Sequence, residues 1–314
     1  MAALKTSTAV EQSTDAVLMI RPHRFHPNPE TAADNAFQRA VNPGEVSEIA
    51  AAAQREFDGA VSTLRGAGVM VHVVEDTSVP EKPDAVFPNN WISTHHDGRV
   101  TLYPMYSEAR RRERRPDVID ELRKHYRVSQ VIDYSGCEKE GRCLEGTGSL
   151  VLDHVNKLAY ACLSHRTHPK TLEQFCADFG YEAVKFRSVS KDGRPIYHTN
   201  VMMCVGSEFA LIGLEMIPDE AERGGVRNLL EATGKEVIEL SPGQIAEFAG
   251  NAIELNNSKE KLLVLSARAQ AALRKEQRAA IERFARLVPL SLSTIELAGG
   301  SARCMLATIH LPPL

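Results

Sequence analysis

Apolar and polar positions along the chain alternate between the periods of helices and of strands. Short apolar runs at residues 17–20 and 69–74 have the length and composition of strands. Between them, residues 46–65 carry apolar side chains at helical spacing, namely Ile49, Ala53, Phe57, Val61 and Leu64. Two glycines follow this stretch and end the helix. The pattern predicts a strand, a helix and a second strand.

The same order then recurs along the rest of the chain. Hairpins are predicted where two apolar runs flank a polar turn, at residues 84–93 with 100–103, 150–152 with 157–162, 201–205 with 209–214, and 252–255 with 261–265. Each hairpin is followed by a predicted helix, at 117–126, 168–179, 221–232 and 267–287. A strand follows each helix, at 128–134, 182–189, 235–240 and 288–295, and one more is predicted at 304–310. The chain is therefore of the α/β class.

The polar residues that open the hairpins reveal a repeat. These residues are Asn90, Glu145, His198, Asn251 and Cys304, and successive members are 55, 53, 53 and 53 positions apart. Such a period indicates a stacked or ring architecture. The predicted modules span about 16–105, 106–165, 166–217, 218–266 and 267–314 of one catalytic domain. The last module lacks one hairpin strand, which the N-terminal strand would supply, closing a ring.

Equivalent strand starts in a ring converge near its axis, so residues distant in sequence would share one pocket. Cys304 follows Gly299-Gly300-Ser301, where glycines permit close approach of a ligand. A thiolate is a nucleophile, and a nearby imidazole such as His198 activates it. Glu145 would fix the tautomer of that imidazole. These three residues are the predicted catalytic group.

Other reactive residue types have simpler interpretations. Cys162, Cys176 and Cys204 stand in apolar segments and fit the role of small core residues. The six cysteines show no C-x-x-C spacing. The histidines of His95-His96-Asp97 precede a turn glycine and are expected to face solvent. We therefore expect no metal and no cofactor.

The net charge and the hydropathy of the chain limit the classes of binding partner that we expect. A net charge of −4 gives no reason to expect nucleic acid or an anionic membrane as a partner. The basic run 110–115 contains a glutamate and is predicted to be solvated. No apolar stretch approaches the length that spans a bilayer, which is about 20 residues. The polar residues 1–15 are predicted to be a frayed start, and the protein is expected to be cytoplasmic. The oligomeric state, including a homodimer, stays open.

Several motifs together resemble the guanidine-modifying, or pentein, superfamily. They are the segment 299–305 around Cys304, Leu144-Glu145-Gly146, and Leu163-Ser164-His165-Arg166-Thr167. This resemblance covers almost the whole chain and implies a five-bladed α/β propeller of ββαβ modules around a central pocket. It also implies that Arg166 holds a substrate α-carboxylate and that Asp84 contacts an α-amino group. The segments 87–95, 103–105 and 198–203 look most like the citrulline utilisation hydrolase branch.

Two positions depart from the arginine deiminases of that superfamily. Where deiminases hold a guanidinium with two aspartates, this chain has Asn90 and Asn200. A guanidinium offers only donors, whereas a ureido group offers both a carbonyl and N–H groups, which suits amides. We therefore expect citrulline as the substrate, converted through a covalent Cys304 intermediate to ornithine, ammonia and carbon dioxide.

Three other functions stay open from the sequence. One is a guanidine substrate, arginine or dimethylarginine, with Asp84 or Glu145 as its counter-charge. Another is an amidinotransferase, in which an acceptor amine replaces water. The third is a pentein that only binds a ligand.

Overall fold

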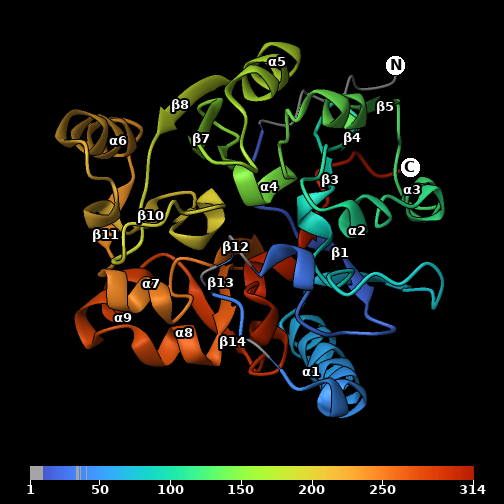
Figure 1. The fold of residues 1–314 in the computed structure, drawn as a ribbon. Helices are drawn as coiled ribbons and strands as arrows, with labels where there is room; N and C mark the ends of the chain where they lie inside the picture. Colours follow the sequence, from blue (N-terminus) through green and yellow to red (C-terminus); the bar gives the residue numbers. More distant parts are fainter. Residues whose placement is uncertain (1–9, 33–34, 36, 40) are drawn as a thin grey trace.

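The computed structural model describes residues 10–32, 35, 37–39 and 41–314, so residues 1–9 of the predicted frayed start lie outside the described part. The fold is mixed α/β, and its strands form five three-stranded sheets in this part of the chain. Figure 1 shows the sheets towards the middle of the molecule, with helices α1, α3, α5, α6 and α9 at its periphery. This arrangement agrees with the predicted repeat of helices and hairpins.

Four of the sheets share one topology. In each, the middle strand pairs antiparallel with the strand before it and parallel with the strand after it. A helix precedes each parallel strand, as a parallel connection requires. The strands are β3 (Ile92–Thr94), β4 (Arg99–Leu102), β5 (Gln130–Asp133), β6 (Val151–Asp153), β7 (Leu158–Cys162), β8 (Glu182–Phe186), β9 (Met203–Val205), β10 (Phe209–Ile212), β11 (Glu236–Glu239), β12 (Ile253–Asn256), β13 (Lys261–Ser266) and β14 (Arg286–Leu290).

The fifth sheet joins the two ends of the chain. Its middle strand, β1 (Ala16–Arg21), pairs parallel with β2 (Met70–Glu75) and antiparallel with β15 (Ala307–Thr308). The amide of Ile309 donates to the carbonyl of Ala16 at 2.9 Å and extends this pairing. The N-terminal strand thus completes the last module, as the missing hairpin strand predicts.

The helices bury one face each against the sheets. The long helix α1 (Val46–Gly66) buries Ala53, Phe57 and Leu64. The other helices are α2 (Glu108–Arg111), α3 (Pro116–Arg123), α4 (Gly146–Ser149), α5 (Pro169–Phe179), α6 (Glu220–Ala232), α7 (Pro242–Ala246), α8 (Ala267–Ala272) and α9 (Lys275–Glu282). Helix α5 begins after His168, which accepts a hydrogen bond from the Lys170 amide, and ends at Gly180 in the left-handed conformation.

The predicted helix at 267–287 is wrong in its middle. The chain extends at Leu273 and Arg274, which separates α8 from α9. The side chain of Gln277 accepts from the Arg274 amide at 2.9 Å, so this glutamine caps a new helix start. The apolar spacing continues across the break, and therefore the sequence pattern does not reveal it.

Three predicted strands begin later than their apolar pattern suggests. The polar residue that opens each hairpin lies in or directly before a short 3-10 turn: Asn90 in η3 (Pro88–Asn90), His198 before η5 (Thr199–Val201) and Cys304 in η8 (Ala302–Met305). The predicted strand at 304–310 is thereby reduced to β15. These turns, with α4, hold the side chains that are described next.

Candidate active site

Three 3-10 turns and one short helix meet where the repeat predicts a shared pocket. Helix α4 packs against η3 and η5, and η3 packs against η8. The contact is close enough to require glycine at position 148, because a β-carbon there would lie 2.3 Å from Asn90 Nδ2 and 2.9 Å from His198 Nδ1. The convergence predicted from the 53- to 55-residue spacing is therefore present.

Cys304 is buried at 5% exposure, and two amides point at its sulfur. Asn251 Nδ2 lies 3.2 Å from Sγ, and Asn200 Nδ2 lies 3.4 Å from it. Asn251 Nδ2 also donates to the main-chain carbonyl of Asn200 at 3.1 Å, which fixes the Asn251 amide in place. Both amides are therefore placed to orient the sulfur and to bond to it as it reacts. This environment suits a nucleophile.

His198 and Glu145 form a buried pair. Nε2 of His198 donates to Oε2 of Glu145 at 2.8 Å, and the Tyr106 amide donates to Oε1 at 2.9 Å. Burial lowers the pKa of His198, and Glu145 opposes this shift. Burial by itself would raise the pKa of Glu145, but the charge of Arg166 and the His198 hydrogen bond lower it to about 2. The arrangement is a carboxylate beside a neutral imidazole, whose Nδ1 is left to exchange a proton.

This low pKa predicts an acid-dependent loss of stability. The folded pKa of Glu145 lies below its ordinary value of 4.5, so its contribution is complete above pH 4.5 and is lost as the pH falls towards 2. The lost contribution is about 3 kcal/mol, from 1.36 kcal/mol for each unit. Denaturant unfolding of wild type and Glu145→Gln between pH 6 and pH 2 measures it. We expect the difference in unfolding free energy to shrink with acidity, and a constant difference would contradict this assignment.

The prediction that the basic run at 110–115 is solvated is wrong for its first residue, Arg110. Arg110 is 3% exposed and forms a two-pronged ion pair with the buried Glu113, with both bonds at 2.8 Å. Nη1 of Arg110 also donates to Asn90 Oδ1 at 2.7 Å, and Nη2 donates to the Phe87 carbonyl at 3.1 Å. A cation is thus built into the candidate site.

Asp84 lies against this cation. Its Oδ2 is 3.7 Å from Arg110 Nε and accepts from Asn28 Nδ2 at 2.9 Å. Burial raises the pKa of Asp84, and Arg110 opposes the shift. Arg166 is also buried, with Nη1 3.6 Å from Glu145 Oε2 and its guanidinium over the Tyr197 ring at 4.7 Å from the centroid.

The seven predicted site residues, together with Arg110, divide into two layers. Six side chains that line one small pocket come from four of the five modules, namely Asp84, Asn90, Arg110, Arg166, His198 and Cys304. Glu145 and Asn200 lie behind His198 and Cys304 and reach them by hydrogen bonds. The sequence assigned no site role to Arg110, Asn28 or Asn251. Of these, Asn251 was detectable, because it occupies the fourth position of the repeat.

Other site types find no support in the described residues. There, no group of three His, Cys, Asp or Glu side chains is placed to hold a metal ion. His95, predicted to face solvent, is buried instead, stacks on Phe179 and bonds Ser93 Oγ at 3.0 Å. No helix in the described part is both long and apolar enough to cross a membrane.

The sequence matches a family model over residues 21–311, described as N,N dimethylarginine dimethylhydrolase, eukaryotic. The chain belongs to this family. The dimethylarginine dimethylhydrolase family lies within the guanidine-modifying superfamily that the motifs resemble, and that resemblance is confirmed. No curated protein matches the sequence.

Solved structures share the family fold. The N-terminal domain of ArgZ, an arginine dihydrolase from the ornithine-ammonia cycle in Cyanobacteria, superposes with a TM-score of 0.73 at 16% identity, over 94% of this chain and 99% of that one. Unliganded AgrE gives 0.70 at 17% identity, over 95% of this chain and 39% of that one. A dimethylarginine dimethylaminohydrolase variant bound to S-methyl-L-thiocitrulline gives 0.64 at 15% identity, over 93% and 98%. At these identities, the likeness concerns the fold.

Proposed function

We propose that this protein is a cysteine-dependent hydrolase that cleaves the ureido group of citrulline. The hydrogen bond from Arg110 to Asn90 carries this choice of substrate. It engages the amide oxygen of Asn90 with a cation, while the Nδ2 donors of Asn90 remain for a ligand. Asn90 Nδ2 is buried and has no hydrogen-bond partner within the described residues.

Asn200 has the opposite orientation. Its Nδ2 donates to Cys304 Sγ, and its Oδ1 is buried with no partner in the described part of the chain. The two amides therefore leave one donor on the pocket wall, at Asn90, and one acceptor behind Cys304, at Asn200. A ureido carbonyl accepts from such a donor, and a ureido N–H donates to such an acceptor. A guanidinium has no acceptor to place at Asn90.

The charges in the pocket favour the same choice. The Arg110 guanidinium lines the pocket and would repel a second guanidinium. The two carboxylates that could balance a guanidinium have other roles, since Glu145 binds His198 and Asp84 is assigned to the substrate α-amino group. Arg166 and Asp84 remain suited to the α-carboxylate and the α-amino group, which every candidate amino acid carries.

The proposed reaction has two steps. Nδ1 of His198 first takes the proton of the Cys304 thiol. The resulting thiolate adds to the ureido carbon, and the bond from this carbon to the ornithine nitrogen breaks while His198 passes that proton to the nitrogen. The carbamoyl group stays on sulfur. His198 then takes a proton from water, which attacks the carbamoyl carbon and releases carbamate, and carbamate decomposes to ammonia and carbon dioxide. Glu145 holds His198 throughout.

The deciding experiment is a steady-state comparison of citrulline, arginine and dimethylarginine with quantified products. We expect citrulline to give the highest kcat/KM and one ornithine for each ammonia. A higher kcat/KM for arginine would contradict the proposal and favour a guanidine hydrolase. Products are also measured with and without glycine, because transfer to glycine would identify an amidinotransferase. Absence of turnover with all three substrates would favour a binding protein.

A further inference from the structure

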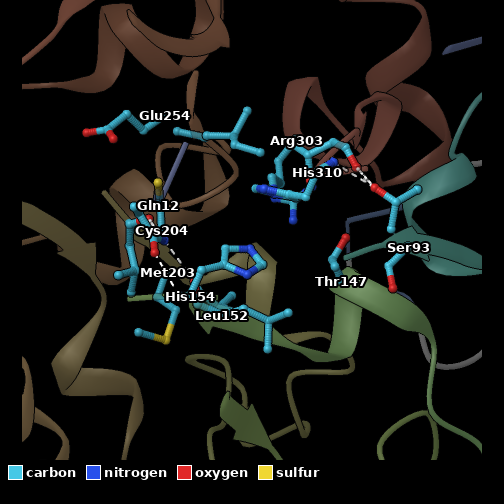
Figure 2. Close-up of a pocket in the computed structure, with 16 residues that line it drawn as sticks. Gln12, Ser93, Thr147, Leu152, His154, Met203, Cys204, Glu254, Arg303 and His310 are labelled. Atoms are coloured by element: carbon cyan, nitrogen blue, oxygen red, sulfur yellow. Dashed lines mark hydrogen bonds between the residues drawn. The ribbon is translucent and has the colours of Figure 1, made fainter. Parts of the chain in front are cut away.

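A second pocket lies beside the nucleophile turn and shares no lining residue with the candidate active site. Figure 2 shows its side chains, with Arg303 and His154 directed into the same space between the sheets. His310 and Thr147 also line it, together with main-chain and side-chain atoms of β9 and β12. Its free volume is about 40 Å³. This is room for about three water molecules, at 10–15 Å³ each.

Arg303 brings a positive charge to this pocket. Its one side-chain hydrogen bond among the described residues joins Nη1 to the Leu306 carbonyl at 3.0 Å, and no carboxylate of that part forms an ion pair with it. Burial lowers the pKa of the guanidinium, and the neighbouring Cys304 and Cys204 thiols oppose the shift. A partly buried cation that forms no ion pair in the described residues is costly, so a bound anion would stabilise it.

Two imidazoles add donors to the same space. The rings of His154 and His310 lie 4.3 Å apart between centroids, and both side chains are buried. Nδ1 of His310 is buried and has no hydrogen-bond partner in the described residues. Burial, and after it the neighbouring imidazole, lowers the pKa of His310 well below its ordinary value. A neutral ring still carries one N–H to donate.

The charges around the pocket admit an anion. Glu254 also lines it, but Ser207 holds both of its carboxylate oxygens, through Oγ at 2.5 Å and the amide at 3.0 Å. Figure 2 shows the Glu254 carboxylate directed away from Arg303. A metal is the wrong occupant, because a guanidinium would repel it and the described histidines form no metal-holding group.

We propose that this pocket binds one small monovalent anion, either a halide or a planar oxyanion of the formate or bicarbonate type. The guanidinium fork of Arg303 matches a planar oxyanion, and a donor from His310 completes the contact. Two hydrogen bonds connect the residue that would hold the anion to Cys304. The main-chain amide of Arg303 donates to Asn251 Oδ1 at 3.0 Å, and Asn251 Nδ2 donates to Cys304 Sγ at 3.2 Å. Binding is independent of which substrate the enzyme hydrolyses.

Thermal unfolding of the full chain tests this site. Chloride, bromide, formate or bicarbonate replaces sulfate at constant ionic strength, since tetrahedral, divalent sulfate is too large for the pocket. We expect a saturable rise in Tm with the small anions, as a ligand of the folded state produces. A stronger response to formate and bicarbonate than to bromide identifies an oxyanion site, and the reverse order identifies a halide site. A flat or non-saturating response overturns the proposal.

Substitutions in the pocket test whether the rise in Tm comes from binding at this site. Arg303→Met should weaken anion binding at least tenfold, and His310→Phe should weaken it to a smaller extent. Arg286→Met, which removes an arginine on the protein surface, should respond as wild type does. Equal responses of Arg303→Met and wild type would overturn the proposal. Should Arg303→Met not fold, anomalous scattering from bromide in wild-type crystals decides, because bromide must lie at Arg303 and His310.

Discussion

Cys304→Ala is expected to abolish citrulline hydrolysis, with a fall in kcat on the order of 10⁴-fold or more. The reason is that the sulfur that receives the Asn251 and Asn200 hydrogen bonds is the only group proposed to attack the ureido carbon. Thermal unfolding should stay close to wild type, because truncation removes one small side chain. Product formation, measured as ornithine released, checks the prediction.

A matched cysteine separates chemistry from packing. Cys176 is 5% exposed, like Cys304, but lies on α5 within the core. Cys176→Ala should keep kcat within about twofold and lose roughly 1 kcal/mol of stability, as small core truncations do. Mass spectrometry of wild type quenched during turnover should find a carbamoyl group on the peptide that contains Cys304. Full activity of Cys304→Ala would remove Cys304 from the mechanism.

Replacing both amides by carboxylates, in the double variant Asn90→Asp with Asn200→Asp, is expected to shift preference from citrulline to arginine. Each aspartate presents acceptors only, which match guanidinium N–H groups and oppose a ureido carbonyl. Two new carboxylates opposite a buried cation are expected to change the ratio of kcat/KM values by about 100-fold or more, since such pairs are worth several kcal/mol.

The two single variants should differ from each other. Asn90 lies beside Arg110, so a carboxylate at that position would be partly neutralised, whereas Asn200→Asp places its charge next to Cys304 Sγ. We therefore expect Asn200→Asp to lower kcat for every substrate and Asn90→Asp to change mainly the substrate ratio. Asn257→Asp, which adds the same charge outside both pockets, should leave the ratio unchanged. An unchanged ratio in the double variant would contradict the role of the amides.

The repeat could be predicted from the sequence because it depends on the spacing of residues along the chain. Apolar spacing specified the helices and strands, and the 53- to 55-residue interval placed Glu145, His198 and Cys304 at equivalent positions of different modules. Equivalent positions in a repeated unit meet when the units surround a common centre. The pairing of Glu145 with His198 at 2.8 Å follows from that rule. So does the contact of Asn251 with Cys304.

Tertiary structure alone decided which polar groups are buried and which way they point. Arg110 and Glu113 stand in a charged run that has the composition of a solvated surface, yet both are buried, with Arg110 bonded to Asn90 of η3 and Glu113 paired with Arg110. The orientation of the Asn90 amide depends on that buried arginine, which lies twenty positions further along the chain. Burial and hydrogen-bond direction depend on neighbours from other modules, whereas periodicity depends only on the residues within one. The sequence by itself therefore determined the repeat and predicted the nucleophile, and the folded chain determined the directions of the amide donor and acceptor near Cys304.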